Sequence, residues 1–177
     1  MDWPPPFKVC YHCGSASIRR IRETAFECGD CSGHLFINPV SAVAGILLDP
    51  ADRMLLIQRA KEPAKGKLSL PGGFLDPGET AEEGLAREVR EETGLEVGGF
   101  QYVGGFPNHY EYDGTVYHTL DLFFEGRVES FAGASALDEV DAVMEVPVTE
   151  IDIELLAFPS VKQALRIFCA NYENHGN

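Results

Sequence analysis

The stretch GGFLDPGETAEEGLAREVREETGL, residues 72–95, carries the signals of a short, capped helix with an acidic end. Thr80 followed three residues later by Glu83 forms a capping box, in which each side chain bonds a backbone N–H at the start of the helix. Gly94 supplies the left-handed residue that commonly ends a helix. The stretch therefore predicts a helix over residues 81–92.

Three glutamates, Glu88, Glu91 and Glu92, fall on one face of this expected helix. At about 100° per residue, their spacings of three and four place them within one arc of roughly 100°. The negative end of the helix dipole disfavours each by roughly 0.3–1 kcal/mol, and like charges at these spacings repel. Such an arrangement suggests a hard divalent cation, which carboxylate oxygens bind well.

The same stretch resembles the box that defines the Nudix hydrolases. That box reads Gly, five residues, Glu, seven residues, Arg-Glu-aliphatic, one residue, Glu-Glu, one residue, Gly-aliphatic. Every fixed position is present here: Gly73, Glu79, Arg87, Glu88, Val89, Glu91, Glu92, Gly94 and Leu95. An isolated Glu-Glu pair would read as an ordinary solvated helix face, but the complete pattern is far more specific. The resemblance covers roughly residues 40–171 and implies an α/β protein, a Nudix-type α/β/α sandwich with a mixed β-sheet.

The resemblance also implies roles for the residues of the box. Mg²⁺ or Mn²⁺ ions are expected on four groups, namely the carbonyl of Gly72 and the carboxylates of Glu88, Glu91 and Glu92. Arg87 and Glu79 are expected to form an ion pair that orients these glutamates. The catalytic base is expected to be one of the glutamates or an acid from a later loop, for which Glu139 is the choice.

The implied activity is metal-dependent hydrolysis of the pyrophosphate bond in a nucleoside diphosphate linked to another moiety. Because a pyrophosphate is protected from water by its own charge, its hydrolysis needs cations and a base. ADP-ribose, NADH and nucleotide sugars are the favoured substrates. The alternatives are a nucleoside triphosphate pyrophosphohydrolase, an RNA-cap-type Nudix enzyme and a non-catalytic, ligand-sensing Nudix regulator.

A basic loop and an aromatic stretch supply the candidate substrate contacts. Arg59 begins a basic cluster in residues 59–67, and its guanidinium fork suits a phosphate. Phe106 and Tyr110 lie in a stretch dense in aromatics, where one of them could stack on a nucleobase. The alternatives are an ordinary solvated loop and aromatics that only pack.

The N-terminal cysteines predict a structural Zn²⁺ site. Two Cys-x-x-Cys pairs, fourteen residues apart, supply Cys10, Cys13, Cys28 and Cys31. Four thiolates fill a tetrahedral site and leave no position for a catalytic water, so the zinc is expected to be structural. His12 and His34 are alternative ligands. Gly14 and Gly29 fit the turns of the pairs, since glycine tolerates the positive φ that such turns often require.

Residues 1–38 are therefore expected to form a small zinc ribbon, and residues 39–177 the Nudix hydrolase domain. A zinc ribbon ahead of a Nudix domain is similar to the NADH pyrophosphatase branch of the family. That branch carries a downstream SQPWPFPxS motif, whereas residues 104–114 here read GGFPNHYEYDG. ADP-ribose or a nucleotide sugar therefore fits at least as well as NADH.

Further elements are expected along the second domain. Residues 40–48 and 53–59 read as strands of a hairpin, and the aromatic stretch 106–117 is expected to connect two later strands. The remaining expected elements are strands at 97–105, 117–124 and 143–146 and an amphipathic helix at 161–172.

The composition limits the expected partners. The 177 residues include 28 acidic and 14 basic side chains, for a formal net charge of −14. This charge repels nucleic acid and anionic membranes, so nonspecific binding to nucleic acid is not expected. The resemblance implies a small-molecule nucleotide as the substrate. The longest nearly apolar run, residues 40–48, falls short of the ~20 residues that cross a bilayer. The N-terminal MDWPPPFKVC lacks the apolar core of a secretory signal, which favours a cytoplasmic protein. A homodimer is a further possibility, since many Nudix proteins dimerise.

Overall fold

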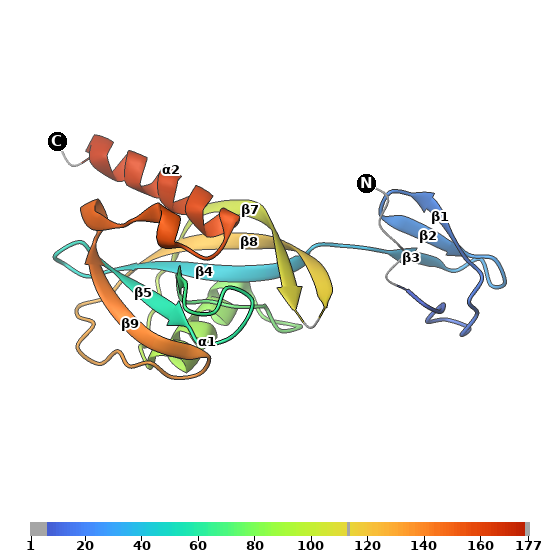
Figure 1. The fold of residues 1–177 in the computed structure, drawn as a ribbon, viewed down its shortest axis with the longest axis horizontal. Helices are drawn as coiled ribbons and strands as arrows, with labels where there is room; N and C mark the ends of the chain where they lie inside the picture. The colour runs from blue at the N-terminus through green and yellow to red at the C-terminus, as the bar shows by residue number, and fades with distance from the viewer. Residues whose placement is uncertain (1–6, 113, 176–177) are drawn as a thin grey trace. The chain divides into compact units, whose positions relative to one another are not determined.

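The computed structural model describes residues 7–112 and 114–175. Contacts divide the chain into two compact units, Met1–Pro39 and Val40–Asn177, drawn as ribbons in Figure 1. Most of the N-terminal stretch considered for a secretory signal lies outside the described residues. Within the described part of the chain, no helix has both the length and the apolar character needed to cross a membrane.

The smaller unit is a three-stranded antiparallel sheet in the order β1-β2-β3. The strands are β1 (Ile18–Arg22), β2 (Ala25–Cys28) and β3 (His34–Phe36). One cluster of four buried residues forms its core: Cys10, Phe26, Cys28 and Leu35. A core of this size supplies little burial energy, and units this small usually need an additional tie such as a metal or a disulfide.

The larger unit is a mixed sheet in the order β6-β5-β4-β8-β7, with β9 paired to β5. The strands β4 and β8 run parallel, and the other neighbours run antiparallel. Its strands are β4 (Val40–Leu48), β5 (Arg53–Arg59), β6 (Leu68–Ser69), β7 (Gln101–Tyr112), β8 (Thr115–Arg127) and β9 (Val140–Pro147). Its helices are α1 (Ala81–Thr93), α2 (Pro159–His175) and two 3₁₀ turns, Val148–Glu150 and Ile153–Leu155.

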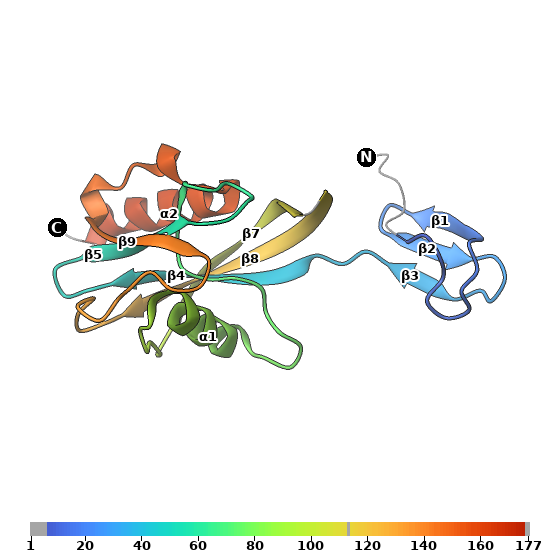
Figure 2. The ribbon, with the colours of Figure 1, turned by 60° about the horizontal axis from the view of Figure 1, so that its bottom comes forward.

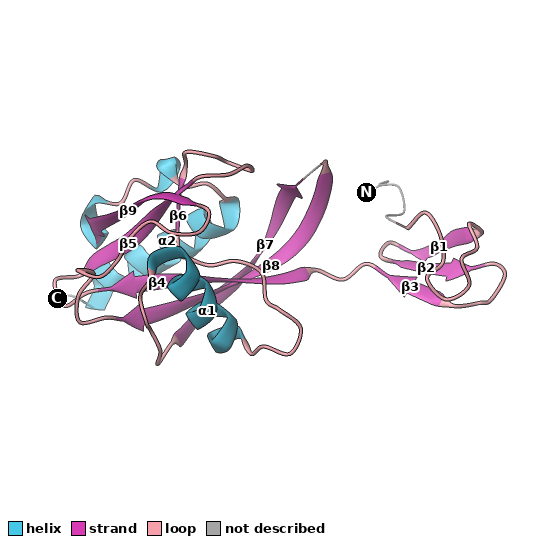
Figure 3. Ribbon diagram, turned by 90° about the horizontal axis from the view of Figure 1, so that it is seen from below, coloured by secondary structure: helices cyan, strands magenta, loops and turns pink. Residues whose placement is uncertain are grey.

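The helices α1 and α2 cover opposite faces of this sheet, as Figures 2 and 3 show. Side chains alternate between the faces along each strand. On β8, Phe124 packs with the α1 residue Leu85, whereas Phe123 packs with the α2 residue Leu165. This two-sided core confirms the expected α/β/α sandwich with a mixed sheet.

The strands β4 and β5 separate soon after the turn that joins them. Their register pairing is limited to Leu48 and Met54, while β5 pairs with β9 along its whole length, from Arg53 to Arg59. The glycine turn before α1 lies against β4 instead, where Val43 N–H donates to the Gly73 carbonyl at 2.9 Å. Gly72 has a φ of 144°, and a Cβ there would lie 2.1 Å from the Val43 carbonyl oxygen. Only glycine fits this close crossing.

The expected boundaries hold for the glycine-rich stretch but not for the aromatic one. Helix α1 begins at the expected residue and ends one residue later than expected. The stretch expected to connect two strands is instead part of them, because β7 extends to Tyr112 and β8 begins at Thr115. Pro107 is tolerated within β7 because that strand lies at the edge of the sheet.

Candidate functional site

Local signals fix helix α1 at both ends. The Thr80 side chain accepts from the Glu83 N–H, and the Glu83 side chain accepts in return from the Thr80 N–H. At the other end, Gly94 is left-handed with a φ of 76°, and its N–H donates to the Arg90 carbonyl. The predicted capping box and glycine stop are both confirmed. They fix the position of the acidic last turns.

The loop before β9 crosses the C-terminal end of α1. Its backbone N–H groups at Ser135, Leu137 and Asp138 donate to the carbonyls of residues 91–93, at 3.0–3.3 Å. These carbonyls would otherwise lack partners within the helix. The contacts therefore hold the residue that follows, Glu139, beside the acidic end of α1.

A cavity of about 360 Å³ opens at this acidic end. Eight of the residues expected in the site line it: Arg59, Gly72, Arg87, Glu88, Glu91, Glu92, Tyr110 and Glu139. Two others, Glu79 and Phe106, are not among its lining residues. Residues far apart in the sequence thus contribute to one cavity.

Arg87 is the central cation of the acidic end. Its Nε and Nη2 donate to the two carboxylate oxygens of Glu79, at 2.8 and 3.0 Å. Its Nη1 donates to Glu88 at 2.8 Å and to Glu91 at 3.2 Å, and Nη2 also reaches the Phe74 carbonyl. The structure brings the expected Arg87–Glu79 pair together, and the same guanidinium orients two of the three glutamates. It also offsets part of the repulsion between them.

Glu92 is held differently from the other two glutamates. Its side chain is only 9% exposed, and its carboxylate accepts from the Gly72 N–H at 2.8 Å. Burial raises the pKa of Glu92 to about 8, and the neighbouring charge of Glu88 adds to the rise against the effect of the Gly72 N–H. Burial also raises the pKa of Glu88. Burial thus disfavours the charged forms of these two carboxyl groups.

Hydrogen bonds from Arg87 and from the Asp76 N–H have the opposite effect on Glu79, whose pKa they lower to about 2. The same contact raises the pKa of the Arg87 guanidinium above its usual value. Glu79 and Arg87 are therefore a permanent ion pair near neutral pH. Their expected orienting function depends on this pair.

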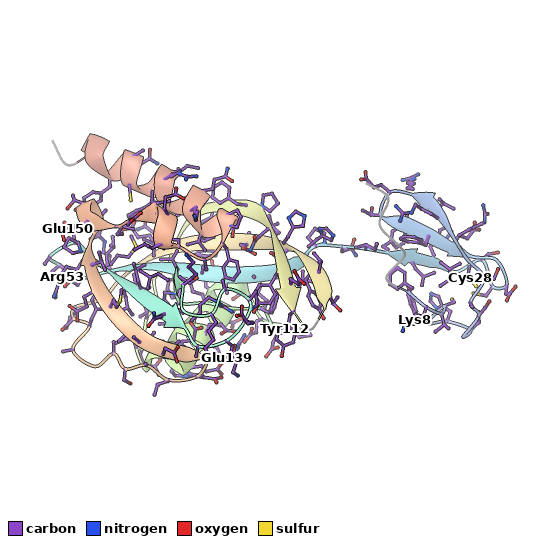
Figure 4. All side chains as sticks on the ribbon, in the orientation of Figure 1. Lys8, Cys28, Arg53, Tyr112, Glu139 and Glu150 are labelled. Atoms are coloured by element: carbon purple, nitrogen blue, oxygen red, sulfur yellow. The ribbon has the colours of Figure 1, made fainter. Side chains whose placement is uncertain are left out.

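Glu139 also lines the cavity, immediately before β9, where Figure 4 labels it. Its side chain is 51% exposed, and Lys61 Nζ donates to its Oε1 at 2.8 Å. Its φ of 54° is in the left-handed region, which non-glycine residues rarely adopt. The Ala60 N–H donates to its carbonyl at 2.9 Å. The basic loop and this acid are therefore tied together.

Arg59 packs against two aromatic rings in the cavity lining. Its guanidinium carbon lies 5.9 Å from the centre of the Tyr110 ring and 5.1 Å from that of Phe158. Its Nε donates to the Pro63 carbonyl at 2.8 Å, and its Nη2 donates to the Tyr110 hydroxyl at 3.3 Å. Two of the three expected substrate contacts, Arg59 and Tyr110, thus lie together.

Phe106, the third expected substrate contact, lies elsewhere. Its ring is 5.9 Å from that of Phe123 and packs on the core cluster beneath α2. It is not part of the cavity lining. Its packing against the core agrees with the alternative given for the aromatic residues, that they only pack.

The cavity also contains a buried polar cluster that the sequence reasoning missed. Asp121 is its centre, accepting from Asn108 Nδ2 at 3.0 Å, Thr119 Oγ1 at 2.6 Å and Ser160 Oγ at 2.6 Å. All four residues are at most 9% exposed. An available signal was the alternation of Thr119, Asp121 and Phe123 within an expected strand, which places an acid on a core-facing side.

The four cysteines of the smaller unit form the other side-chain cluster. Their sulfur atoms all lie within 4.8 Å of one another, and the four thiols are free. The Cys10–Cys31 and Cys13–Cys28 sulfurs are 3.8 and 3.6 Å apart. A tetrahedral zinc site with Zn–S bonds of ~2.3 Å separates its sulfurs by about 3.8 Å. The cluster could therefore hold such an ion, and neither His12 nor His34 belongs to it.

The two glycines expected in these turns are required for different reasons. Gly14 has a positive φ of 76°, as expected, but the positive φ of the second turn is at Ser32, with 57°. Gly29 is needed for space, because a Cβ there would lie 2.5 Å from Ser17 Oγ. The expectation of a positive φ at Gly29 is wrong.

Comparison with protein families identifies the family of the larger unit. A model of the NUDIX domain matches residues 38–167. The chain therefore belongs to the NUDIX domain family, and the resemblance drawn from the glycine-rich stretch is confirmed.

Known relatives are similar over different parts of the chain. The NAD-capped RNA hydrolase NudC of Stutzerimonas stutzeri is 33% identical over 172 residues, which is 96% of this chain and 57% of that protein. An ADP-ribose pyrophosphatase of Methanocaldococcus jannaschii is 49% identical over 61 residues, which is 34% of this chain and 36% of that protein. The matches thus span little more than half of the first relative and about a third of the second.

Solved structures agree on the fold. The crystal structure of a NUDIX hydrolase from Nitrosomonas europaea aligns with a TM-score of 0.74 at 24% identity and covers 96% of this chain and 94% of that one. This likeness supports the fold alone.

Proposed function

We propose that the protein is a metal-dependent Nudix hydrolase that cleaves the pyrophosphate bond of a nucleoside diphosphate linked to another moiety. One observation carries this proposal: Glu88, Glu91, Glu92 and Glu139 line the same cavity as Arg59. Carboxylates that can hold cations thus adjoin a guanidinium that can bind phosphate.

The residues at the acidic end of α1 fit a hard divalent cation. Their donor set is oxygen only: the carboxylates of Glu88, Glu91 and Glu92, with the Gly72 carbonyl as the expected fourth group. The raised pKa values of Glu88 and Glu92 reflect burial that disfavours their charged forms, and a bound cation would stabilise those forms. Bound Mg²⁺ or Mn²⁺ would neutralise the diphosphate and polarise its phosphorus–oxygen bonds. Arg87, held by Glu79, keeps the ligands in position.

Glu139 is the proposed base. Lys61 holds its Oε1, so the proton of the attacking water would pass to Oε2. Arg59, on the neighbouring strand β5, would bind a substrate phosphate, and Tyr110 would pack against the nucleoside. Protonating Glu139 or removing its carboxylate would slow the attack without removing the metal ligands.

The smaller unit is proposed to be a zinc ribbon, residues 1–38, ahead of the hydrolase domain, residues 39–177. The sulfur distances and the chemistry of four thiolates support Zn²⁺. Since four thiolates complete the coordination, this zinc would stabilise the ribbon and take no part in hydrolysis.

ADP-ribose is the first proposed substrate, because one relative is an ADP-ribose pyrophosphatase. NAD-capped RNA is the second candidate, because the NudC relative aligns with 96% of this chain, including most of the ribbon. The net charge of −14 opposes a long RNA and favours a free nucleotide. NADH and nucleotide sugars share the same reacting diphosphate.

The test is a panel of ADP-ribose, NAD, NADH, nucleotide sugars, nucleoside triphosphates and NAD-capped RNA, each with Mg²⁺ and with Mn²⁺. Chromatography of the products would show AMP released from ADP-ribose. Preference for the capped RNA, with a rate that falls steeply with added salt, would favour the second candidate. Binding of ADP-ribose without turnover under any condition would favour a sensing regulator over an enzyme.

Two further proposals come from the sequence and the resemblance. A cytoplasmic location agrees with the reduced thiols that a ribbon needs. A homodimer would be tested by sedimentation at several protein concentrations.

A further inference from the structure

The buried cluster around Asp121 has one atom without a partner. Among the described residues, no group bonds Asn108 Oδ1, although this atom is buried and Asn108 is only 5% exposed. A buried acceptor left without a donor is costly, and nearly all such atoms in proteins are paired. Asn108 is also one of the residues that line the cavity, so a donor group of a ligand bound there could complete this amide.

The orientation of the Asn108 amide follows from its neighbour. The Asp121 carboxylate can only accept, so the amide must turn its NH₂ group toward it, and Nδ2 donates to Asp121 Oδ2 at 3.0 Å. Ser160 and Thr119 also donate to the same carboxylate. The three donors hold Asp121 in place, and through it they fix Oδ1 of Asn108 as the acceptor.

The surroundings of the cluster are small and apolar. On the neighbouring strand β4, Ala42 pairs with Asp121, and Ala44 pairs with Phe123. Both alanines line the cavity together with Phe123 and Val161. A flat apolar group with a hydrogen-bond donor at its edge suits such a place better than a sugar, which carries hydroxyls on several sides.

The same cavity contains the acidic end of α1 and the Asn108 cluster. The two groups of residues approach it from different layers, because α1 and α2 cover opposite faces of the sheet. A diphosphate at the glutamates could therefore extend a nucleoside toward Asn108. This step of the argument rests on the proposed function.

We propose that Asn108 Oδ1 accepts a hydrogen bond from an N–H group of the substrate's nucleobase and that it makes the enzyme select bases with an amino donor at this edge. Asp121, Thr119 and Ser160 are positioning residues, which hold the amide in the selecting orientation. Leaving the buried acceptor without a donor is what would penalise other bases.

The experiment compares ADP-ribose with its analogue that carries purine in place of adenine and so lacks only the 6-amino group. Both are hydrolysed in Mg²⁺ by the wild-type protein, Asn108→Leu and Asn108→Ala. For the wild type we expect kcat/KM to fall roughly ten- to hundredfold when the amino group is lost. In the Asn108 variants the two substrates should be used nearly equally, with most of the change in KM.

Thr115→Val is the matched control. Thr115 is exposed on the same strand β8 and lies outside the cavity lining, so preference for the amino group should persist in this variant. Thermal unfolding of each variant separates lost selectivity from lost folding. The alanine variant adds no apolar bulk, and it keeps the test valid where the leucine variant fails to fold.

Equal use of both substrates by the wild type would overturn the inference, as would persisting preference in a folded Asn108 variant. A further analogue carries 2′-deoxyribose on the adenosine half. If substitution of Asn108 no longer changed kcat/KM with this analogue but still changed it with the purine analogue, Asn108 would contact the ribose and the base assignment would be wrong. Hydrolysis without preference would leave the proposed function intact. If no diphosphate is hydrolysed, the proposed function fails, and calorimetric binding of the two compounds still decides the inference, equal affinities overturning it.

Discussion

The smaller unit buries one cluster of four residues, whereas the larger unit packs a cluster on each face of its sheet. In the smaller unit, two of the buried residues are Cys10 and Cys28, which are also expected metal ligands. In the larger unit, the glutamates border a core made by other residues, such as Leu85 and Val89. If the proposed metals bind, a metal takes the place of a core in one unit and serves chemistry in the other.

The largest expected effect is on the smaller unit. Cys13→Ser should lose the bound zinc and the order of the three-stranded sheet, because this unit has little core to hold it. Metal analysis and hydrogen exchange of residues 18–36 would measure both, and exchange within α1 should stay slow. One equivalent of zinc retained by the variant would contradict four-thiolate binding, and loss of protection in α1 would break the contrast between the units.

Glu139→Gln tests the chemistry of the larger unit. Removing a general base should lower kcat by roughly 10²–10⁴-fold, while the melting temperature stays close to that of the wild type. The half-exposed position of this side chain explains the small effect on folding. Steady-state kinetics with ADP-ribose would measure the loss. Nearly unchanged kcat would transfer the role of base to a glutamate of α1.

Glu91→Gln tests the metal ligands, with Glu82→Gln on the same helix as the matched control. We expect a loss of roughly 10²–10³-fold in kcat, because the variant lacks one of the carboxylates that would hold the cation against the diphosphate. Glu91 is 46% exposed, so folding should be little affected. Glu82 is exposed outside the cavity lining, and its variant should keep its activity. Similar kcat values for the two variants would argue against a metal at Glu91.

The smallest effect is on acid stability. The pKa of Glu79 is depressed to about 2 from its usual 4.5, so its ion pair with Arg87 stabilises the fold above pH 4.5. That contribution should disappear as the pH falls from about 4.5 to about 2. Urea unfolding of the wild type and Glu79→Gln at several pH values should therefore converge in this range. A difference that does not change with pH would show that the pair adds no stability.

The sequence was most informative where structure is local. The boundaries of α1 depend on neighbours three or four residues apart, so Thr80, Glu83 and Gly94 were enough to predict them. The metal-ligand spacing of the cysteines is equally local. Gly29 was less informative, because a glycine can be required by φ or by space, and only the neighbouring Ser17 decides which.

Prediction failed where strands distant in sequence meet. Asn108 and Asp121 are brought together by the pairing of β7 with β8, and Ser160 comes from α2. No spacing rule links these three residues. The position of Phe106 outside the cavity lining could not be predicted for the same reason, since its register on the sheet decides whether its ring faces the cavity or the core.

The loop over the last turn of α1 has a mechanical consequence. Its three backbone contacts set the height of Glu139 above the glutamates through main-chain atoms rather than through long side chains. Main-chain hydrogen bonds thus join Glu139 to the acidic end of α1, while another wall of the cavity is formed by β7, β8 and α2. Exchanging residues on that wall could change which nucleotide enters and leave the spacing between the proposed base and the proposed cation ligands unaltered.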